Sequence, residues 1–160
     1  MLFRLAAATA AAVLFVPAFI DAQVLMQRDV SLKMALTIAQ TALEECGGNA
    51  SVAVVDRAGR IRVLLQGDTA NPHNPELARR KAYTARTFRT TSAEWAKRTE
   101  AGGNPGQRML ADVIPLGGGV PINVGEDTIG AVGLSGAQGG QVREEACAKT
   151  GIAKVAAQLK

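Results

Sequence analysis

A lysine inside an apolar helical stripe is the residue of this sequence best placed to do chemistry. Residues 76–89 have helical spacing, and a helical wheel puts Lys81 on the same side as Leu77, Ala85 and Phe88. A charge in that position is costly unless it is paired. Lys81 therefore pairs with a carboxylate or backbone carbonyls, or it serves a ligand.

The only histidine of the chain, His73, stands in a loop of proline and asparagine directly before that helix. It can ligate iron or titrate near neutral pH. An ordinary loop histidine is an equally good interpretation. Arg79 and Arg86 fall on the helix face opposite Lys81, where we expect them to contact solvent.

Two glycine clusters, Gly117–Gly119 and Gly136–Gly140, could let the backbone approach a ligand closely. Neither has the spacing and strand-to-helix context of a dinucleotide or phosphate loop. Ser135 follows Gly133 as in a nucleophile elbow, but Ala137 replaces the closing glycine. The sequence therefore offers no complete catalytic set and leaves enzymatic activity undecided.

These residues are set in alternating helical and strand-like segments. The order is a helix, a β-hairpin, two helices, a meander of two or three strands and a last helix, which predicts an antiparallel sheet covered by helices. The expected helices span residues 31–46, 76–89, 92–98 and 144–159, and the strands come from residues 51–55, 60–66, 113–116, 120–125 and 128–135.

The first 22 residues have the pattern of a secretory signal peptide. Arg4 precedes an apolar stretch, Leu5 to Ile20, and Ala22 ends a small-residue cleavage site. The stretch is shorter than the roughly 20 residues that span a bilayer, so cleavage is favoured over a membrane anchor. We expect residues 23–160 to form one periplasmic or secreted domain, with no stable membrane span after cleavage.

The remaining composition bounds the function. The net charge is +4 and aromatic residues are 4% of the chain. Nucleic-acid binding is disfavoured, because the clustered basic and aromatic residues expected of it are missing. Two cysteines, Cys46 and Cys147, suggest a disulfide in an exported protein, and two separate buried thiols are the alternative.

Four segments together resemble the GlcG/HbpS-like haem-binding (haem-degrading) domain family, and with the helices between them they cover about residues 31–158. The resemblance implies a profilin-like α/β (α+β) fold with a five-stranded antiparallel sheet. The segments read VAVVDRAG at 52–59, ARRKAYTA at 78–85, GGGVPI at 117–122 and IGAVGLSG at 129–136.

The resemblance also implies a function and a homo-oligomeric assembly. The expected function is an exported protein that binds haem or another tetrapyrrole and acts as a sensor, carrier or scavenger of haem or its iron. A basic stretch at residues 79–89 would suit the haem propionates, and His73 could ligate the iron. Alternatives are an enzyme that uses Lys81 on haem or a small metabolite, a corrinoid-binding protein, or an accessory oligomer.

Carried over residue by residue, the family motifs indicate a set of cofactor-binding positions. The acidic residue that family members often have after the second glycine loop falls within residues 141–145, where either Arg143 or Glu144 stands in its place. The motif positions are Lys81, Thr84, Gly117, Gly118, Gly119 and Pro121, to which His73 is added as the candidate metal ligand.

The family topology makes the first and last strands neighbours. Cys46 then lies where the first helix meets the first strand, and Cys147 lies about one turn into the last helix. The resemblance therefore implies a disulfide between Cys46 and Cys147, because their Cα atoms could come within the ~5.5 Å that a disulfide needs.

Overall fold

The computed structural model describes residues 23–100 and 102–160. The signal peptide predicted over residues 1–22 lies outside this part of the chain. Within the described part, no helix has both the length and the apolar character needed to cross a membrane.

The first helix, α1 (Leu32–Cys46), has the ends that the sequence predicts. The Ser31 hydroxyl accepts a hydrogen bond from the backbone N–H of Met34 at 3.2 Å, which satisfies one of the free donors of the first turn. Gly47 ends the helix at a φ of 87°, a conformation that glycine adopts without strain.

The described strands form one antiparallel sheet in the order β2-β1-β4-β3. β1 is buried along its whole length and pairs with β4, so that Val52 faces Leu134 across the strands. This pairing confirms that the first and last strands are neighbours. The strands are β1 (Ser51–Val55), β2 (Ile61–Gln66), β3 (Gly119–Val124) and β4 (Asp127–Ser135).

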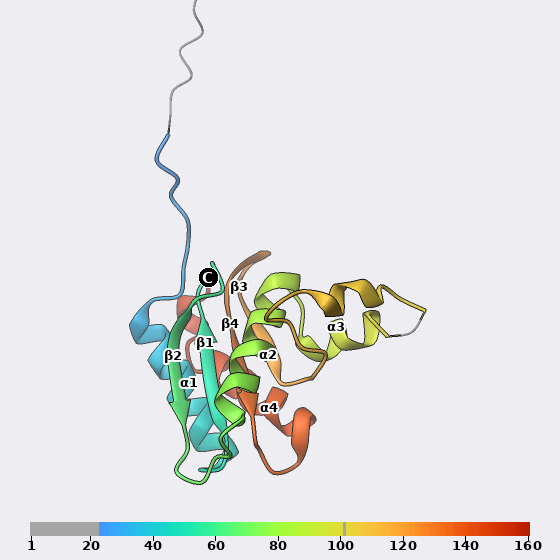
Figure 1. The fold of residues 1–160 in the computed structure, drawn as a ribbon. Helices are drawn as coiled ribbons and strands as arrows, with labels where there is room; N and C mark the ends of the chain where they lie inside the picture. Colours follow the sequence, from blue (N-terminus) through green and yellow to red (C-terminus); the bar gives the residue numbers. More distant parts are fainter. Residues whose placement is uncertain (1–22, 101) are drawn as a thin grey trace, which may run out of the picture.

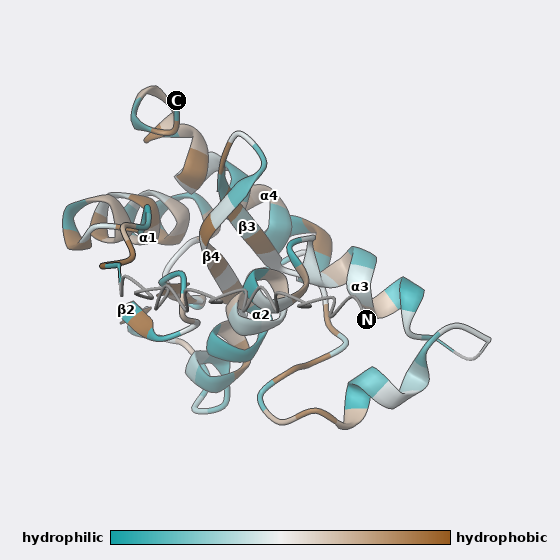
Figure 2. Cartoon of the chain, turned by 90° about the horizontal axis from the view of Figure 1, so that it is seen from above, coloured by the Kyte–Doolittle hydropathy of each residue, from teal (hydrophilic) through white to brown (hydrophobic). Residues whose placement is uncertain are grey.

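Helices cover both faces of the sheet (Figure 1). α2 (Asn74–Phe88) packs mainly on β4, β1 and β3, with α3 (Ser92–Arg98) beside it, while α1 and α4 (Gly140–Ala153) pack together on the other face. In Figure 2, β3 and β4 are largely hydrophobic and lie between these two helical layers. Two short 3₁₀ helices, Pro105–Met109 and Ala156–Gln158, complete the fold.

The expectation of five strands is wrong for the described residues, which contain four. Residues 113–116 are apolar but do not join the sheet. The N–H of Ile114 donates to the Thr84 hydroxyl at 2.9 Å, and the Arg80 guanidinium donates to the carbonyl of Val113. Side chains of α2 thus take the backbone groups that a fifth strand would use for pairing.

The last helix begins earlier than residues 144–159 suggest, since α4 starts at Gly140. It also runs through Gly151 without a break. A Cβ on Gly151 would lie 2.6 Å from the carbonyl oxygen of Ile38, so glycine here allows α1 and α4 to approach closely.

The predicted disulfide is confirmed. Cys46 at the end of α1 is bonded to Cys147 in α4, with the Cα atoms 5.8 Å apart and a sequence separation of 101 residues. In the chain-entropy model a loop of this length gives up to about 4.7 kcal/mol of stabilisation. The neighbouring Arg143 guanidinium donates to the Glu45 carboxylate at 2.8 Å, which ties the same two helices together.

Candidate functional site

Lys81 is buried and paired with a carboxylate. Its Nζ lies 2.6 Å from Oε2 of Glu144, and the two side chains are 3% and 5% exposed. Lys81 comes from the middle of α2 and Glu144 from the first turns of α4, so the pair joins the two helical layers. Of the roles that the sequence leaves open for Lys81, pairing with a carboxylate is the one found.

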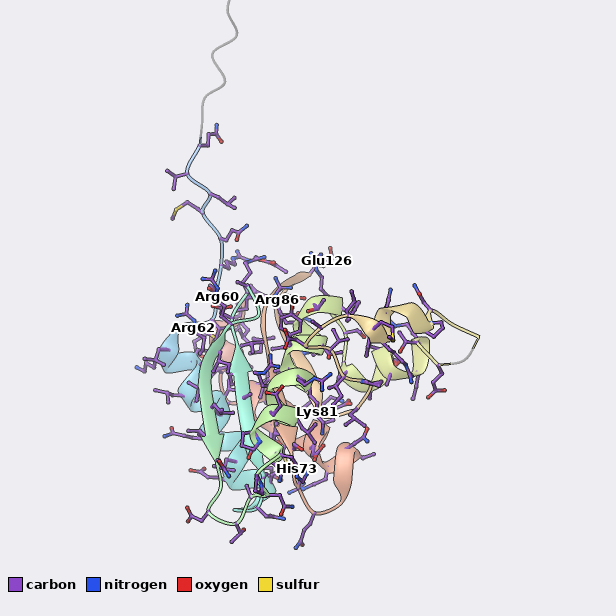
Figure 3. The ribbon with its side chains drawn as sticks, in the orientation of Figure 1. Arg60, Arg62, His73, Lys81, Arg86 and Glu126 are labelled. Atoms are coloured by element: carbon purple, nitrogen blue, oxygen red, sulfur yellow. A yellow bond between two sulfur atoms is a disulfide. The ribbon has the colours of Figure 1, made fainter. Side chains whose placement is uncertain are left out.

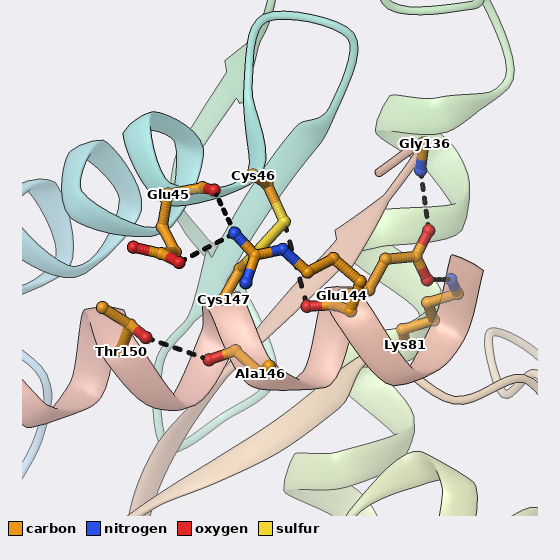
Figure 4. Close-up of a disulfide and its surroundings, with 9 residues drawn as sticks. Glu45, Cys46, Lys81, Gly136, Glu144, Ala146, Cys147 and Thr150 are labelled. Atoms are coloured by element: carbon orange, nitrogen blue, oxygen red, sulfur yellow. Dashed lines mark hydrogen bonds and ion pairs between the residues drawn. A yellow bond between two sulfur atoms is a disulfide. The ribbon is translucent and has the colours of Figure 1, made fainter. Parts of the chain in front are cut away.

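The pair is anchored to the backbone where β4 ends. The second carboxylate oxygen of Glu144 accepts a hydrogen bond from the N–H of Gly136 at 2.8 Å (Figure 4). Both oxygens of the carboxylate therefore have a hydrogen-bond donor, which offsets the cost of burying this side chain.

The first glycine cluster packs directly against this pair. Gly118 has a φ of 111°, and a Cβ there would lie 2.9 Å from Oε2 of Glu144. A Cβ on Gly119 would lie 2.2 Å from the carbonyl oxygen of Lys81. The N–H of Gly117 donates to the Gln141 side chain at 2.6 Å. These glycines bring the start of β3 against α2 and α4, so this close approach is internal to the protein.

Thr84 and Pro121 lie apart from the pair. The Thr84 hydroxyl donates to the carbonyl of Arg80 at 2.8 Å and accepts from Ile114, so it fastens residues 113–116 to α2. Pro121 lies within β3, opposite Ala131 of β4. The structure thus brings Lys81, Gly118 and Gly119 together, while Thr84 and Pro121 support neighbouring parts of the fold.

His73 is exposed at the residue before α2, about two turns from Lys81 (Figure 3). Its side chain makes no capping hydrogen bond to the helix. Next to it, Asn74 is buried and accepts from the Ser135 hydroxyl at 3.4 Å, which fixes the start of α2 beside the end of β4. Among the described residues no three His, Cys, Asp or Glu side chains gather into a metal site.

Of the two residues that the sequence offers for the acidic position, Glu144 is paired with Lys81 and Arg143 with Glu45. The sequence carried a signal for the burial of Glu144. On a helical wheel Glu144 lies within about 60° of Cys147 and Gly151, on the buried side of α4. A carboxylate on the buried side of a helix needs a cation as a partner. In the same way, Lys81 on the buried side of α2 needs an anion.

A groove lies beside Gln141, between α3 and α4. Its volume is about 450 Å³, and it is lined by Ala93, Val142 and Ala146, with Lys97 and Lys149 among its polar residues. Lys149 is paired with Glu145 at 2.7 Å. The groove has the apolar lining and peripheral charge of a surface that could hold an amphipathic ligand.

The burial of Lys81 and Glu144 predicts how substitutions at these residues change the free energy of unfolding. Lys81→Met or Glu144→Leu alone should lower the free energy of unfolding by about 3–5 kcal/mol, because each leaves a buried charge without a partner. The double variant should be more stable than either single variant, because no charge then remains. Urea denaturation of the four proteins measures the coupling.

The matched control is the more exposed pair of Lys149 and Glu145 on the same helix, whose side chains are 59% and 19% exposed. The equivalent cycle, Lys149→Met with Glu145→Leu, should give a coupling of only about 0.3–0.5 kcal/mol. Equal couplings at the buried and exposed pairs would contradict the structural role assigned to Lys81.

Comparison with known proteins places this geometry in a family. No curated protein matches the chain. Among solved structures, HbpS is 32% identical over 82% of this chain and 93% of HbpS, with a TM-score of 0.77. A double mutant of Streptomyces reticuli HbpS is 31% identical over 91% of this chain and 97% of its own, with a TM-score of 0.74.

A complex of PduOC with haem is a further match, 25% identical over 78% of this chain and 93% of PduOC, with a TM-score of 0.69. The family model described as "Haem degrading protein HbpS-like" matches residues 28–153, which include the sheet, the four α-helices of the described part and the pair of Lys81 and Glu144. The chain therefore belongs to the HbpS-like family of haem-degrading proteins.

Proposed function

We propose that this protein binds haem with His73 as a ligand to the iron, and that it acts as an exported sensor, carrier or scavenger of haem or its iron. The family assignment supports haem as the ligand, and the relative PduOC is described in complex with haem. Haem needs few ligands from a protein, and a single histidine is a common one.

The observation that carries the proposal is a row of side chains along α2 that begins at the exposed His73 and continues with the partly buried Leu77 and Arg80. His73 has helical backbone angles, so Leu77 and Arg80 follow it on roughly the same side of the helix. Arg80 lies about 10 Å farther along the axis. The imidazole of His73 would then bind the iron, the apolar side chain of Leu77 would contact the macrocycle, and the cation of Arg80 would contact a propionate.

Arg80 has unused hydrogen-bonding capacity for that role. Its guanidinium donates to the carbonyl of Val113, but its Nε is buried without a hydrogen-bond partner among the described residues. The terminal N–H groups that Val113 does not use are the ones from which a haem propionate could accept. Arg80 also belongs to the basic stretch at residues 79–89 that the sequence favours for propionates.

Ferric haem added to the purified protein should produce a saturable Soret band. His73→Ala should weaken binding by at least about tenfold, or change the position of the band, because the iron loses its protein ligand. Absorbance titration at constant ionic strength provides the measurement.

Val142→Asp is the matched control, since it places a charge in the groove between α3 and α4 and leaves α2 unchanged. It should bind haem as the unchanged protein does. Loss of binding in Val142→Asp with normal binding in His73→Ala would move the ligand to that groove. The absence of any spectral change at micromolar haem would reject the proposed function.

Export is supported by two independent features. Residues 1–22 have the pattern of a signal peptide, and the disulfide between Cys46 and Cys147 is a bond that persists in oxidising compartments. An exported haem-binding protein would meet haem outside the cytosol.

Expression of the full chain in a bacterium with a secretory system should release a protein that begins at Gln23. Signal peptidase cleaves after small residues such as Ala22. N-terminal sequencing of periplasmic and medium fractions tests this, with a version lacking residues 1–22 as the control that stays in the cytosol. Recovery of the full chain only in the cytosol, with Met1 retained, would argue against export.

A further inference from the structure

A cavity at the other end of α2 from His73 is lined by two arginines. Its volume is about 360 Å³, and its walls come from the segment before α1, the β1–β2 turn and α2. The lining residues are Gln27, Asp29, Arg57, Ala58 and Arg86. Arg60 and Arg62 lie at the same end of the molecule as Arg86, and His73 lies at the opposite end (Figure 3).

The two carboxylates whose charges act on Arg86, those of Asp29 and Asp127, are already engaged with other groups. Oδ1 of Asp29 accepts from the N–H groups of Val30 at 2.7 Å and Arg57 at 2.9 Å, and its Oδ2 faces Arg62 at 3.4 Å. Asp127 holds the guanidinium of Arg57 through both of its oxygens. The fold thus uses both acids to fix the β1–β2 turn.

Arg86 has no direct partner for its charge among the described residues. It forms no ion pair there, and its Nε is buried with no hydrogen-bond partner. Burial, followed by the charges of Arg57 and Arg89, lowers the pKa of the Arg86 guanidinium. A partly buried cation without an ion pair at the wall of a cavity costs free energy unless an anion binds to it.

We infer that this cavity binds a small oxyanion, the carboxylate or phosphate group of a small molecule, through the guanidinium of Arg86. The planar fork of arginine matches both groups with two parallel hydrogen bonds. The Gln27 amide, which also lines the cavity, can donate a further hydrogen bond. This inference does not depend on haem binding, because the cavity and His73 lie at opposite ends of the molecule.

The test follows the Nε–H signal of Arg86 by NMR in the full protein during separate titrations with inorganic phosphate and with succinate. Chloride keeps the ionic strength constant, because screening alone changes surface charges. We expect a saturable shift with a dissociation constant of about millimolar or tighter. The tighter of the two probes identifies phosphate or carboxylate as the preferred group.

Two variants separate a specific site from general charge. Arg86→Gln should weaken binding of the preferred anion by at least about tenfold. Arg98→Gln removes the same charge from the exposed end of α3 and should bind as the unchanged protein does. Arg86→Lys keeps the charge without the fork and should bind in between.

Arg86→Gln should fold, because the side chain makes no hydrogen bond or ion pair within the described residues, and its denaturation midpoint without anion should be unchanged or higher. No saturable shift with either anion, or an equal loss of binding in Arg86→Gln and Arg98→Gln, would overturn the inference. Should Arg86→Gln fail to fold, the shift of the Arg86 signal in the unchanged protein still decides the question.

Discussion

The fold is organised around an ion pair that crosses from one helical layer to the other. Lys81 on α2 and Glu144 on α4 meet beyond the end of β4, where neither is open to water. Burial of either charge alone would cost several kcal/mol, so the pair couples the placement of α2 to that of α4. The carboxylate also holds the N–H of Gly136, so the start of α4 is fixed to the end of β4.

The disulfide extends this constraint to α1. Cys147 follows Glu144 by about one turn and is bonded to Cys46 at the end of α1. The first half of α4 is thereby tied to α2 on one side and to α1 on the other. Glycines 118 and 119 fit the start of β3 into the space left between α2 and α4. This explains why glycine-rich sequence surrounds the pair.

The same constraint divides the polar side chains of α2 into two groups with different tasks. Lys81 and Thr84 are committed to partners within the protein. His73 is exposed at the start of the helix, Arg80 is partly buried beside Val113, and Arg86 lines a separate cavity at the other end of the helix. The proposed ligands therefore contact the second group, while Lys81, within the family motif, holds the helices in place.

Local patterns predicted much of this arrangement. Periodicity gave the helices and the β1–β2 hairpin, the apolar stripe showed that Lys81 needs a partner, and the family topology paired Cys46 with Cys147. The missing strand could not be foreseen, because residues 113–116 have strand-like composition and only the side chains of Arg80 and Thr84, some thirty residues earlier, capture their backbone.

The start of α4 was misplaced because Gly139 and Gly140 have the composition of a loop, yet α4 begins at Gly140. Arg86 lacks an ion pair because Asp29 and Asp127 bind groups of the β1–β2 turn instead. The sequence alone does not show which groups these two acids bind. Contacts between segments distant in the chain therefore determine both the number of strands and the lack of an ion pair at Arg86.

A crystal structure of the protein with bound haem tests this division of α2 most directly. We expect the iron to be bonded to His73, a propionate to contact Arg80, and the pair of Lys81 and Glu144 to remain formed. Iron ligated by another residue with His73 free, or Lys81 released from Glu144 to contact the haem, would contradict it.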